Sequence, residues 1–312
     1  MKITVIGHLC LDVILHPDGT ETQSYGGIFF SVAALANLLG PKDTVAPVFG
    51  VGKADHDALI ERLNSYPNVD RSGIYSFNGP SNRVRLVYSN RSERTECSKN
   101  ISEPITYKRI RPHLDADMIL VNMISGFDVT LEAFDELRMG VREENIPIYL
   151  DIHSLTLGVK EDDTRFHRPV ELWRRWLFMI RAAQMNEEEA AILSTDRLDE
   201  TALAKQTLAL NTGALLITRG ERGCTAFIDE HKHMRRVDVP GIAIASASDP
   251  TGCGDVFGAA YCAHYAKTKD VESSARFANK VAALNAGLAG SEAIDTISSF
   301  RLVEAAEEPA AS

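Results

Sequence analysis

The segment 249–261, DPTGCGDVFGAAY, combines a glycine-rich turn with a carboxylate. Gly252 and Gly254 flank Cys253, Asp255 follows at once, and an apolar helix is predicted to start here. The N–H groups and the dipole of a helix N-terminus attract an anion such as a phosphoryl group. A carboxylate at that place repels phosphate, but it can take a proton from a hydroxyl that attacks phosphorus. The alternative role for Asp255 is that of a simple helix cap.

Two other nucleotide-binding patterns were compared with this turn. Gly252, Gly254 and Gly258 approximate the dinucleotide fingerprint, which requires a parallel strand after the helix. A second helix is predicted there instead, over 271–289. The run 50–53 lacks the spacing and the Ser or Thr of a Walker loop. The pattern therefore favours phosphoryl transfer over dinucleotide binding.

Composition narrows the class of protein. Hydrophobic residues make up 45% of the 312 residues and charged residues 24%, which is typical of a soluble globular protein. The formal net charge of −10 disfavours nucleic acid or an anionic membrane as the main partner. Five scattered cysteines without a C-x-x-C pair disfavour a disulfide framework and a zinc site. No signal peptide and no long apolar run is found, so we expect a cytoplasmic protein.

Short β-branched runs alternate with helical patterns along the chain, which predicts an α/β fold with a parallel sheet covered on both faces. Strands are predicted over 2–7, 44–52, 117–122, 146–152, 214–218 and 224–228. Helices are predicted over 28–39, 55–64, 130–143, 170–181, 187–194, 199–211, 252–267 and 271–289.

Two segments depart from this alternation. Residues 13–25 and 82–98 each resemble a strand pair, with turns at 17–19 and 90–93, and neither is followed by a covering helix. A small antiparallel sheet that projects from the main domain accounts for both, and such a sheet can act as a lid. We expect one domain over 1–300 and a frayed tail over 301–312.

Five motifs in order carry a resemblance to a known family. DPTGCGD resembles the C-terminal signature of the ribokinase, or PfkB, family of carbohydrate and nucleoside kinases. The other matching segments are IGHLCLD (6–12), YGGIFFSVAALANLLG (25–40), MNEEEA (185–190) and ITRGERGC (217–224). The match spans about residues 1–295 and implies a ribokinase-like, doubly wound, mostly parallel sheet with a β-sheet lid.

The resemblance also implies roles for the acceptor side of the site. Asp255 would be the catalytic base, and the N–H groups of Gly252, Cys253 and Gly254 would form an anion hole. Acceptor-binding positions would be Asp12, Gly26, Gly27 and Ser31. The alternatives are a turn residue for Asp12 and a tight turn for the glycine pair.

On the nucleotide side, the resemblance implies that Glu189 organises Mg²⁺ and its waters near the phosphates of ATP. The other implied nucleotide-binding residues are Asn186, Thr218, Gly220, Gly223 and Asn279. The alternatives are a helix cap made by Asn186 and Glu189, a plain hairpin turn at Gly220 and Gly223, and a solvated Asn279.

Three departures from the family pattern bear on the acceptor. Ser31 stands where the family usually has Asn, Cys253 replaces a commoner alanine, and LDIHS (150–154) lacks the D-x-N-x-R pattern of many sugar kinases. Phe29 and Phe30 beside the glycine pair are bulkier than usual. Either these rings stack on a nucleobase, which favours a ribonucleoside, or they begin the apolar face of helix 28–39.

The expected activity is therefore transfer of the γ-phosphoryl group of ATP to a primary hydroxyl of a ribonucleoside or sugar, with Mg²⁺. The alternatives are a ribokinase- or fructokinase-like free-sugar kinase and a non-catalytic sugar or nucleotide sensor on the same fold. The resemblance leaves open a monovalent-cation requirement and a homodimer formed through the lid.

Overall fold

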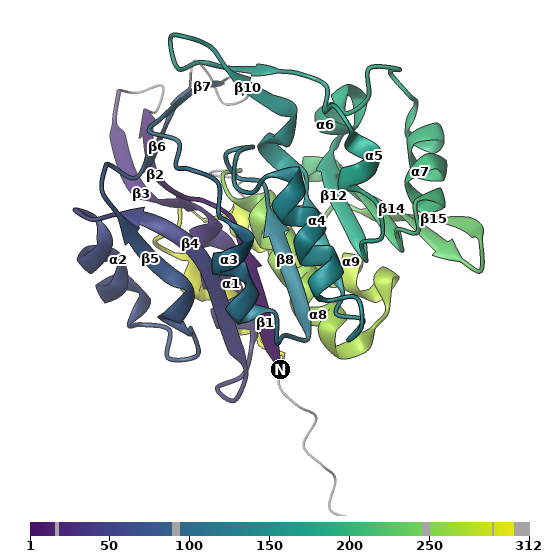
Figure 1. Ribbon diagram of the computed structural model, residues 1–312, viewed down its shortest axis with the longest axis horizontal. Coiled ribbons are helices and arrows are strands. Elements are labelled where there is room, and N and C mark those ends of the chain that lie inside the picture. The colour runs from purple at the N-terminus through teal and green to yellow at the C-terminus, as the bar shows by residue number, and fades with distance from the viewer. Residues whose placement is uncertain (16–18, 89–93, 245–249, 289, 303–312) are drawn as a thin grey trace, which may run out of the picture.

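A nine-stranded sheet forms the centre of the protein in the computed structural model, which describes residues 1–15, 19–88, 94–244, 250–288 and 290–302 (Figure 1). Its strand order is β15-β14-β13-β12-β9-β8-β1-β4-β5. Pairing is parallel from β5 through β13 and antiparallel for β14 and β15. The strands are β1 (Lys2–Ile6), β4 (Thr44–Gly52), β5 (Ile74–Phe77), β8 (Met118–Asn122), β9 (Ile148–Asp151), β12 (Ala182–Asn186), β13 (Ala214–Thr218), β14 (Gly223–Glu230) and β15 (His233–Pro240).

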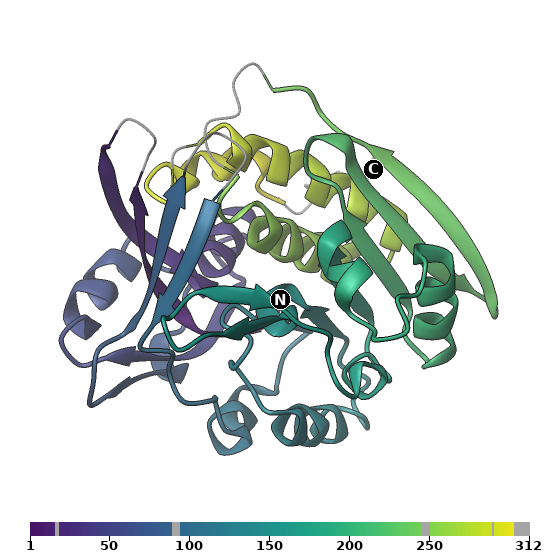
Figure 2. The same cartoon turned by 90° about the horizontal axis from the view of Figure 1, so that it is seen from above.

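The central strands are apolar on both faces because helices cover the sheet from two sides. All five residues of β8 are buried, and so are all four of β9. Figure 2 shows α1 (Ile28–Leu38), α8 (Cys253–Thr268) and α9 (Val271–Ala286) on one face, with α3 (Tyr107–Ile110) and α4 (Leu131–Gly140) on the other. The remaining helices are α2 (His56–Leu63), α5 (Trp173–Trp176), α6 (Glu187–Ile192) and α7 (Glu200–Ala209).

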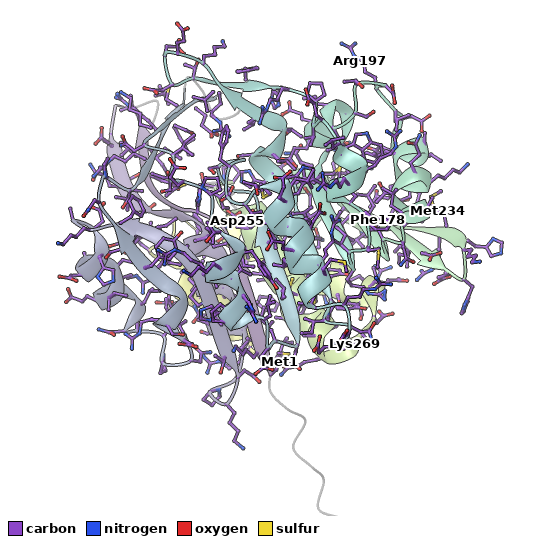
Figure 3. The ribbon with its side chains drawn as sticks, viewed as in Figure 1. Met1, Phe178, Arg197, Met234, Asp255 and Lys269 are labelled. Carbon is purple, nitrogen blue, oxygen red and sulfur yellow. The ribbon has the colours of Figure 1, made fainter. Side chains whose placement is uncertain are left out.

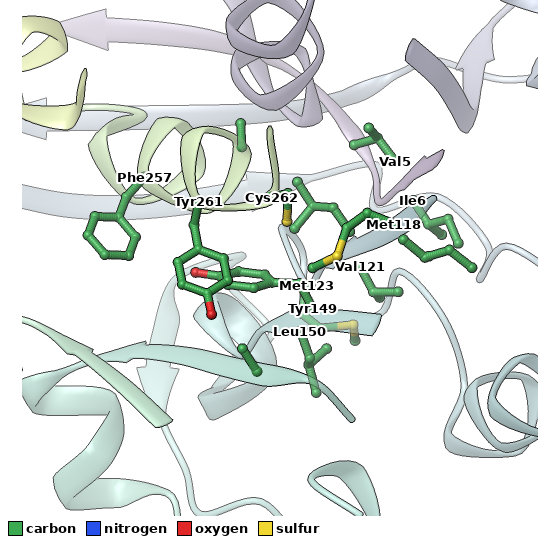
Figure 4. Close-up of a cluster of buried hydrophobic side chains, with 14 of the residues drawn as sticks. Val5, Ile6, Met118, Val121, Met123, Tyr149, Leu150, Phe257, Tyr261 and Cys262 are labelled. Atoms are coloured by element: carbon green, nitrogen blue, oxygen red, sulfur yellow. The ribbon is translucent and has the colours of Figure 1, made fainter. Parts of the chain in front are cut away.

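Helix α8 is held against β8 and β9 by a packed apolar layer (Figure 4). Tyr261 of α8 and Tyr149 of β9 have ring centroids 5.0 Å apart, and both side chains are fully buried. Burial of an aromatic pair of this kind stabilises the fold by several kcal/mol, on the order of 2–3 per ring. The packing fixes the N-terminus of α8 over the carboxyl ends of the neighbouring strands.

The predicted lid is present as a separate four-stranded sheet, ordered β3-β2-β6-β7. It is built from β2 (Leu9–Leu15), β3 (Glu21–Gly27), β6 (Asn82–Tyr88) and β7 (Arg94–Lys99). The β2–β6 pair is parallel, so the lid is mixed rather than antiparallel throughout. Parts of the predicted turns at 17–19 and 90–93, and the tail from 303, lie outside the described residues.

A short hairpin follows β9 that the sequence patterns did not predict. It comprises β10 (Leu157–Val159) and β11 (Arg165–His167), and its strands of three residues are too short to show an alternating pattern. The Ser98 N–H of the lid donates to the Asp163 carbonyl at 3.0 Å. The hairpin therefore joins the lid to the main domain.

The helix predicted over 170–181 is wrong. Only α5 forms there, and β12 follows at Ala182. Leu172 and Met179 both adopt left-handed backbone conformations, with φ of 53° and 56°, and these interrupt the apolar helical spacing on either side of α5. None of the helices in the described residues is long and apolar enough to cross a membrane.

Candidate active site

The carboxyl ends of four neighbouring parallel strands frame one site. Strands β8, β9, β12 and β13 end at Asn122, Asp151, Asn186 and Thr218. Ligands in open α/β sheets bind at this edge, outside the strand ends. Figure 3 places Asp255 near the middle of the molecule, whereas Met1, at the amino end of β1, lies at its lower margin. The N-terminus of α8 thus faces the strand ends.

Asp255 is a buried carboxylate held by two strand-end residues. It is 5% exposed and lies in the first turn of α8. The Asn122 amide donates to Asp255 Oδ1 at 2.8 Å, and His153 Nε2 lies 4.0 Å from the same oxygen. Burial raises the pKa of Asp255 above its usual value, although the His153 charge and the Asn122 hydrogen bond lower it. Such a carboxylate can accept a proton at neutral pH.

Ser31 contacts Asp255 rather than opening into a pocket. Its side chain is fully buried, and its hydroxyl donates to the Asp255 carbonyl at 3.3 Å. The Asn122 amide approaches the same hydroxyl at 3.4 Å. The shorter serine, where the family usually has Asn, therefore lies against the first turn of α8, and its predicted acceptor contact stays a prediction.

The expectation that Phe29 and Phe30 stack on a nucleobase is wrong. Both side chains are 1% exposed, and every residue of α1 is buried. A Cβ on Gly252 would lie 2.4 Å from the Phe30 ring, so this ring packs directly on the turn before α8. The second reading of these aromatics, as part of the apolar surface of the helix, is the correct one.

The two glycines of the signature play different structural parts. Gly252 is the N-cap of α8 with φ of 75°, a conformation that favours glycine. Gly254 has no such backbone requirement, and a Cβ there would meet Gln184 Nε2 at an ordinary 3.5 Å. The absence of a side chain at Gly254 matters only if a ligand approaches the backbone. N–H groups in the first turn of a helix have no acceptor within the helix, and that of Cys253 donates to the Pro250 carbonyl at 3.2 Å.

A buried hydrogen-bond network around Gln184 supports the first turn of α8. Gln184 Nε2 donates to the Gly254 carbonyl at 3.0 Å and to Asp151 Oδ2 at 3.1 Å, and Gln184 Oε1 accepts from the Tyr149 hydroxyl at 2.5 Å. Burial raises the pKa of Asp151 well above its usual value. This network fixes the position of the α8 N-terminus relative to β9 and β12.

Asp12 and the glycine pair lie together at the base of the lid. Cys10 and Asp12 of β2 pair with Gly26 and Ser24 of β3, and Asp12 is 5% exposed. A Cβ on Gly26 would lie 1.8 Å from Asp12 Oδ2, so the carboxylate occupies the space of the missing side chain. Gly27, with φ of 59°, caps α1.

Several acidic side chains lie near the buried Cys10 thiol and affect its pKa. Its pKa is raised well above the usual value, first by burial and then by the charges of Asp12, Asp128, Glu96 and Asp255. Carboxylates from the lid, from the loop after β8 and from α8 are therefore close enough for their charges to act on this one thiol. Carboxylates accept hydrogen bonds from hydroxyls, so a polyhydroxylated acceptor suits this group of residues.

On the nucleotide side, Asn186 and Glu189 form a reciprocal capping box. Asn186 Oδ1 accepts from the Glu189 N–H at 2.8 Å, and Glu189 accepts from the Asn186 N–H at 2.7 Å and from its amide at 2.8 Å. Burial raises the pKa of Glu189 to about 7, although the charge of His153 lowers it. Thr218 pairs with Asn186 in register at the strand ends.

Gly220 and Gly223 form the turn between β13 and β14, with φ of 55° and 92°. A Cβ on Gly220 would meet nothing within 4 Å, whereas one on Gly223 would strike the Val239 carbonyl at 2.1 Å. Asn279 of α9 is 8% exposed and donates to the Pro240 carbonyl at 2.9 Å. Asn279 is therefore a buried contact between α9 and β15 rather than a solvated residue, and its predicted nucleotide contact stays a prediction.

The donor set fits Mg²⁺ only as a largely hydrated ion. No cluster of three or more His, Cys, Asp or Glu side chains with metal-binding geometry occurs among the described residues. Carboxylate oxygens are present, however, and Glu189 lies near Asp255 and Asp151 closely enough for their charges to interact. Mg²⁺ usually keeps several waters and binds through one or two carboxylates plus substrate phosphates. Glu189 is the residue that would hold such an ion through its waters.

Four residues of this site were not identified from the sequence: Asn122, Asp151, His153 and Gln184. Asn122 ends a predicted strand and Asp151 lies one residue before the end of another, and that position was a usable signal. His153 was noticed only as a departure from a motif. Gln184 lies in β12, which was not predicted, so no signal pointed to it.

Comparison with known proteins establishes the family. The chain is 33% identical over 307 residues to the ribokinase of Bacillus subtilis (strain 168), covering 91% of this chain and 92% of that protein. The chain belongs to the PfkB family of carbohydrate kinases. The family model for pfkB family carbohydrate kinases matches residues 168–296, which include all of α8 and α9. The resemblance inferred from the motifs is thereby confirmed.

Other PfkB proteins show similar relationships. The cytidine kinase of Thermococcus kodakarensis is 23% identical over 278 residues, covering 88% of this chain and 92% of that protein. The ribokinase structure from Thermotoga maritima superposes with a TM-score of 0.73 at 18% identity, covering 96% of this chain and 99% of that one. The structure of the Burkholderia thailandensis nucleoside kinase in complex with inosine superposes with a TM-score of 0.72 at 18% identity. The match covers 95% of this chain and 94% of that one. The ribokinase-like fold with its lid is thus confirmed.

Proposed function

We propose that this PfkB protein transfers the γ-phosphoryl group of ATP to a primary hydroxyl of a small acceptor, and that the acceptor is a ribonucleoside. The observation that carries the kinase assignment is the buried Asp255 carboxylate at the N-terminus of α8, oriented by Asn122 at 2.8 Å. An anion-binding helix terminus and a positioned base are the two parts that phosphoryl transfer requires.

The acceptor lies between Asp12 and Asp255 in this proposal. Asp12 accepts hydrogen bonds from a vicinal diol, and Asp255 takes the proton from the primary hydroxyl as its oxygen attacks the γ-phosphorus. ADP leaves with the electrons of the broken P–O bond. The N–H groups in the first turn of α8 stabilise the charge on the transferred group. Mg²⁺, when bound, neutralises charge on the phosphates.

Two observations favour a nucleoside. The sugar-kinase pattern after β9 is absent, and His153 stands where that pattern has Asn. The cytidine kinase and the inosine-bound nucleoside kinase described above extend over most of the chain. Free ribose is the second candidate, because the ribokinase match has the higher identity of the two relatives, 33% against 23%.

A substrate panel tests both parts of the proposal. ADP release is measured with ATP and Mg²⁺ for cytidine, uridine, inosine, adenosine, ribose and fructose. A nucleoside should exceed every free sugar in kcat/KM by at least tenfold. A free sugar that wins by that margin overturns the nucleoside assignment alone. Absence of turnover with every hydroxyl acceptor contradicts the kinase assignment and favours the sensor alternative.

A further inference from the structure

Arg165 of the β10–β11 hairpin is a buried cation with unused hydrogen-bonding capacity. Its side chain is 3% exposed. Nη2 donates to the Ser125 carbonyl at 2.7 Å, but Nε and Nη1 have no hydrogen-bond partner within the described part of the chain. Buried donors without acceptors are costly and rare, so a group that fills them is expected.

The position of Arg165 identifies the part of the acceptor that it would meet. The chain that leaves β8 begins at Asn122, which contacts Asp255, and passes Ile124, whose side chain borders Gly27. It then reaches Ser125, which holds Arg165. Arg165 therefore lies beside the loop after β8, and Asp255, the proposed base, is not among the described groups that act on its charge. In a ribonucleoside, the base is the part farthest from the primary hydroxyl.

The lid register places Arg165 on the inner face of the lid. Asp12 and Ile14 of β2 lie opposite Val84 and Leu86 of β6, and Leu86 lies opposite Glu96 of β7. Residues directly opposite share a face, so Glu96 lies on the same face as Asp12. Arg165 Nε is 3.9 Å from Glu96 Oε1, longer than a hydrogen bond.

The charges around Arg165 favour a neutral oxygen acceptor over an anion. Asp128 and Glu96 act on the Arg165 guanidinium, and Asp12 lies on the same lid face as Glu96. The exposed Arg168 adds a second positive charge. The carboxylates of Asp128, Glu96 and Asp12 disfavour a phosphate or carboxylate on the acceptor. A carbonyl oxygen, which can accept two hydrogen bonds, suits the two donors.

We infer that Arg165 selects acceptors by donating to a carbonyl oxygen of the nucleobase, so that the substrates are cytidine, uridine or inosine rather than adenosine. Cytosine, uracil and hypoxanthine each carry a carbonyl, whereas adenine offers only ring nitrogens and an amino group. This inference rests on the proposed nucleoside kinase function. Nε and Nη1 are inaccessible to solvent in this structure, so a nucleobase reaches them only when a neighbouring side chain such as Glu96 moves.

The test compares acceptors in Arg165→Gln, Arg165→Lys and the control Arg85→Gln. Arg85 is exposed and lies on the outer face of the lid, opposite Val13 and Cys97. Loss of the paired, charge-assisted hydrogen bonds should lower kcat/KM for cytidine and inosine about 10- to 100-fold in Arg165→Gln, and by a smaller factor in Arg165→Lys, which keeps one charged donor. Values for ribose and adenosine should change less than threefold, and Arg85→Gln should match wild type throughout.

Other outcomes overturn either this inference or the kinase proposal. An equal fall for ribose and cytidine would mean that Arg165 only holds the hairpin in place. Wild-type preference for adenosine contradicts it without any variant, which keeps the test decisive if Arg165→Gln does not fold. Calorimetric binding of cytidine and adenosine without ATP separates the two proposals. Selective cytidine binding that depends on Arg165, without turnover, contradicts only the kinase function, whereas turnover without base discrimination contradicts only the role of Arg165.

Discussion

His153 Nε2 lies 4.0 Å from Asp255 Oδ1, so a titratable imidazole borders the proposed base. Burial alone would lower the pKa of His153, but the charges of Asp255, Asp151 and Glu189 outweigh it and the pKa is raised. His153 also has φ of 35°, a left-handed conformation that costs a non-glycine residue on the order of 1 kcal/mol. His153 thus lies within reach of the charges of three acidic side chains.

Replacement of His153 by Gln should move the acid limb of the kcat/KM profile to higher pH. Asp255 acts as a base only when ionised, and the His153 charge lowers its pKa. Removal of that charge raises the pKa of Asp255, so activity is lost at a higher pH as the solution is acidified. The profile is measured with saturating ATP between pH 5 and 9. The wild-type protein is measured in parallel, so that ionisation of ATP affects both profiles equally. An acid limb that stays in place would show that His153 does not act on the base.

Asp255→Asn should lower kcat by at least about 100-fold while ATP affinity stays within a few fold. The amide keeps the size and polarity of the side chain but cannot accept the proton. ATP binding by calorimetry and the thermal unfolding midpoint serve as controls for the fold. A variant with near-normal kcat would return Asp255 to the role of a helix cap.

The two signature glycines should respond in opposite ways to alanine. Gly252→Ala places a Cβ 2.4 Å from the Phe30 ring at φ of 75°, and should destabilise the fold by about 2–5 kcal/mol. Gly254→Ala meets only Gln184 at 3.5 Å and should leave the unfolding midpoint nearly unchanged. If phosphate approaches the backbone there, kcat/KM still falls at least tenfold. Wild-type activity in Gly254→Ala would exclude that approach.

The sequence identified the residues at element boundaries better than those fixed by tertiary packing. Asp255 and Glu189 follow recognisable helix starts, and Asn122 ends a strand whose apolar run is unmistakable. The direction of Phe30, by contrast, depends on α1 packing against the turn before α8, 222 positions farther along the chain. No local pattern carries that information, which is why a stacking role was a reasonable but mistaken expectation.

The hairpin that carries Arg165 was missed for a different reason. Three-residue strands cannot show a period, and their register is set by the contact between Ser98 and Asp163. A helix was wrongly predicted over 170–181, directly before β12. The strand β12 and its residue Gln184 were not predicted. The segments that carry Arg165 and Gln184 therefore have weak local signals.

Glu189→Gln should raise the Mg²⁺ concentration that gives half the maximal rate by about threefold or more. Glutamine at this position can keep the capping box with Asn186, so the helix start is preserved while the charge is lost. Rates are titrated against free Mg²⁺ at fixed ATP. Glu188→Gln, on the same turn and exposed, is the matched control. An Mg²⁺ dependence that is equal in both variants would leave Asn186 and Glu189 as a helix cap only.

Gly26→Ala should weaken binding of the acceptor without weakening binding of ATP. The added Cβ would lie 1.8 Å from Asp12 Oδ2, so the carboxylate must move away from its position beside the glycine pair. Loss of hydrogen bonds to the acceptor diol should raise KM for the acceptor about tenfold or more, with KM for ATP within twofold. Gly40→Ala is the control, because a Cβ there would meet only Asp43 Oδ2 at an ordinary 3.5 Å. Asp12→Asn should also raise KM for the acceptor, because it removes the charge without adding bulk. A normal acceptor KM in both variants would show that Asp12 does not bind the acceptor.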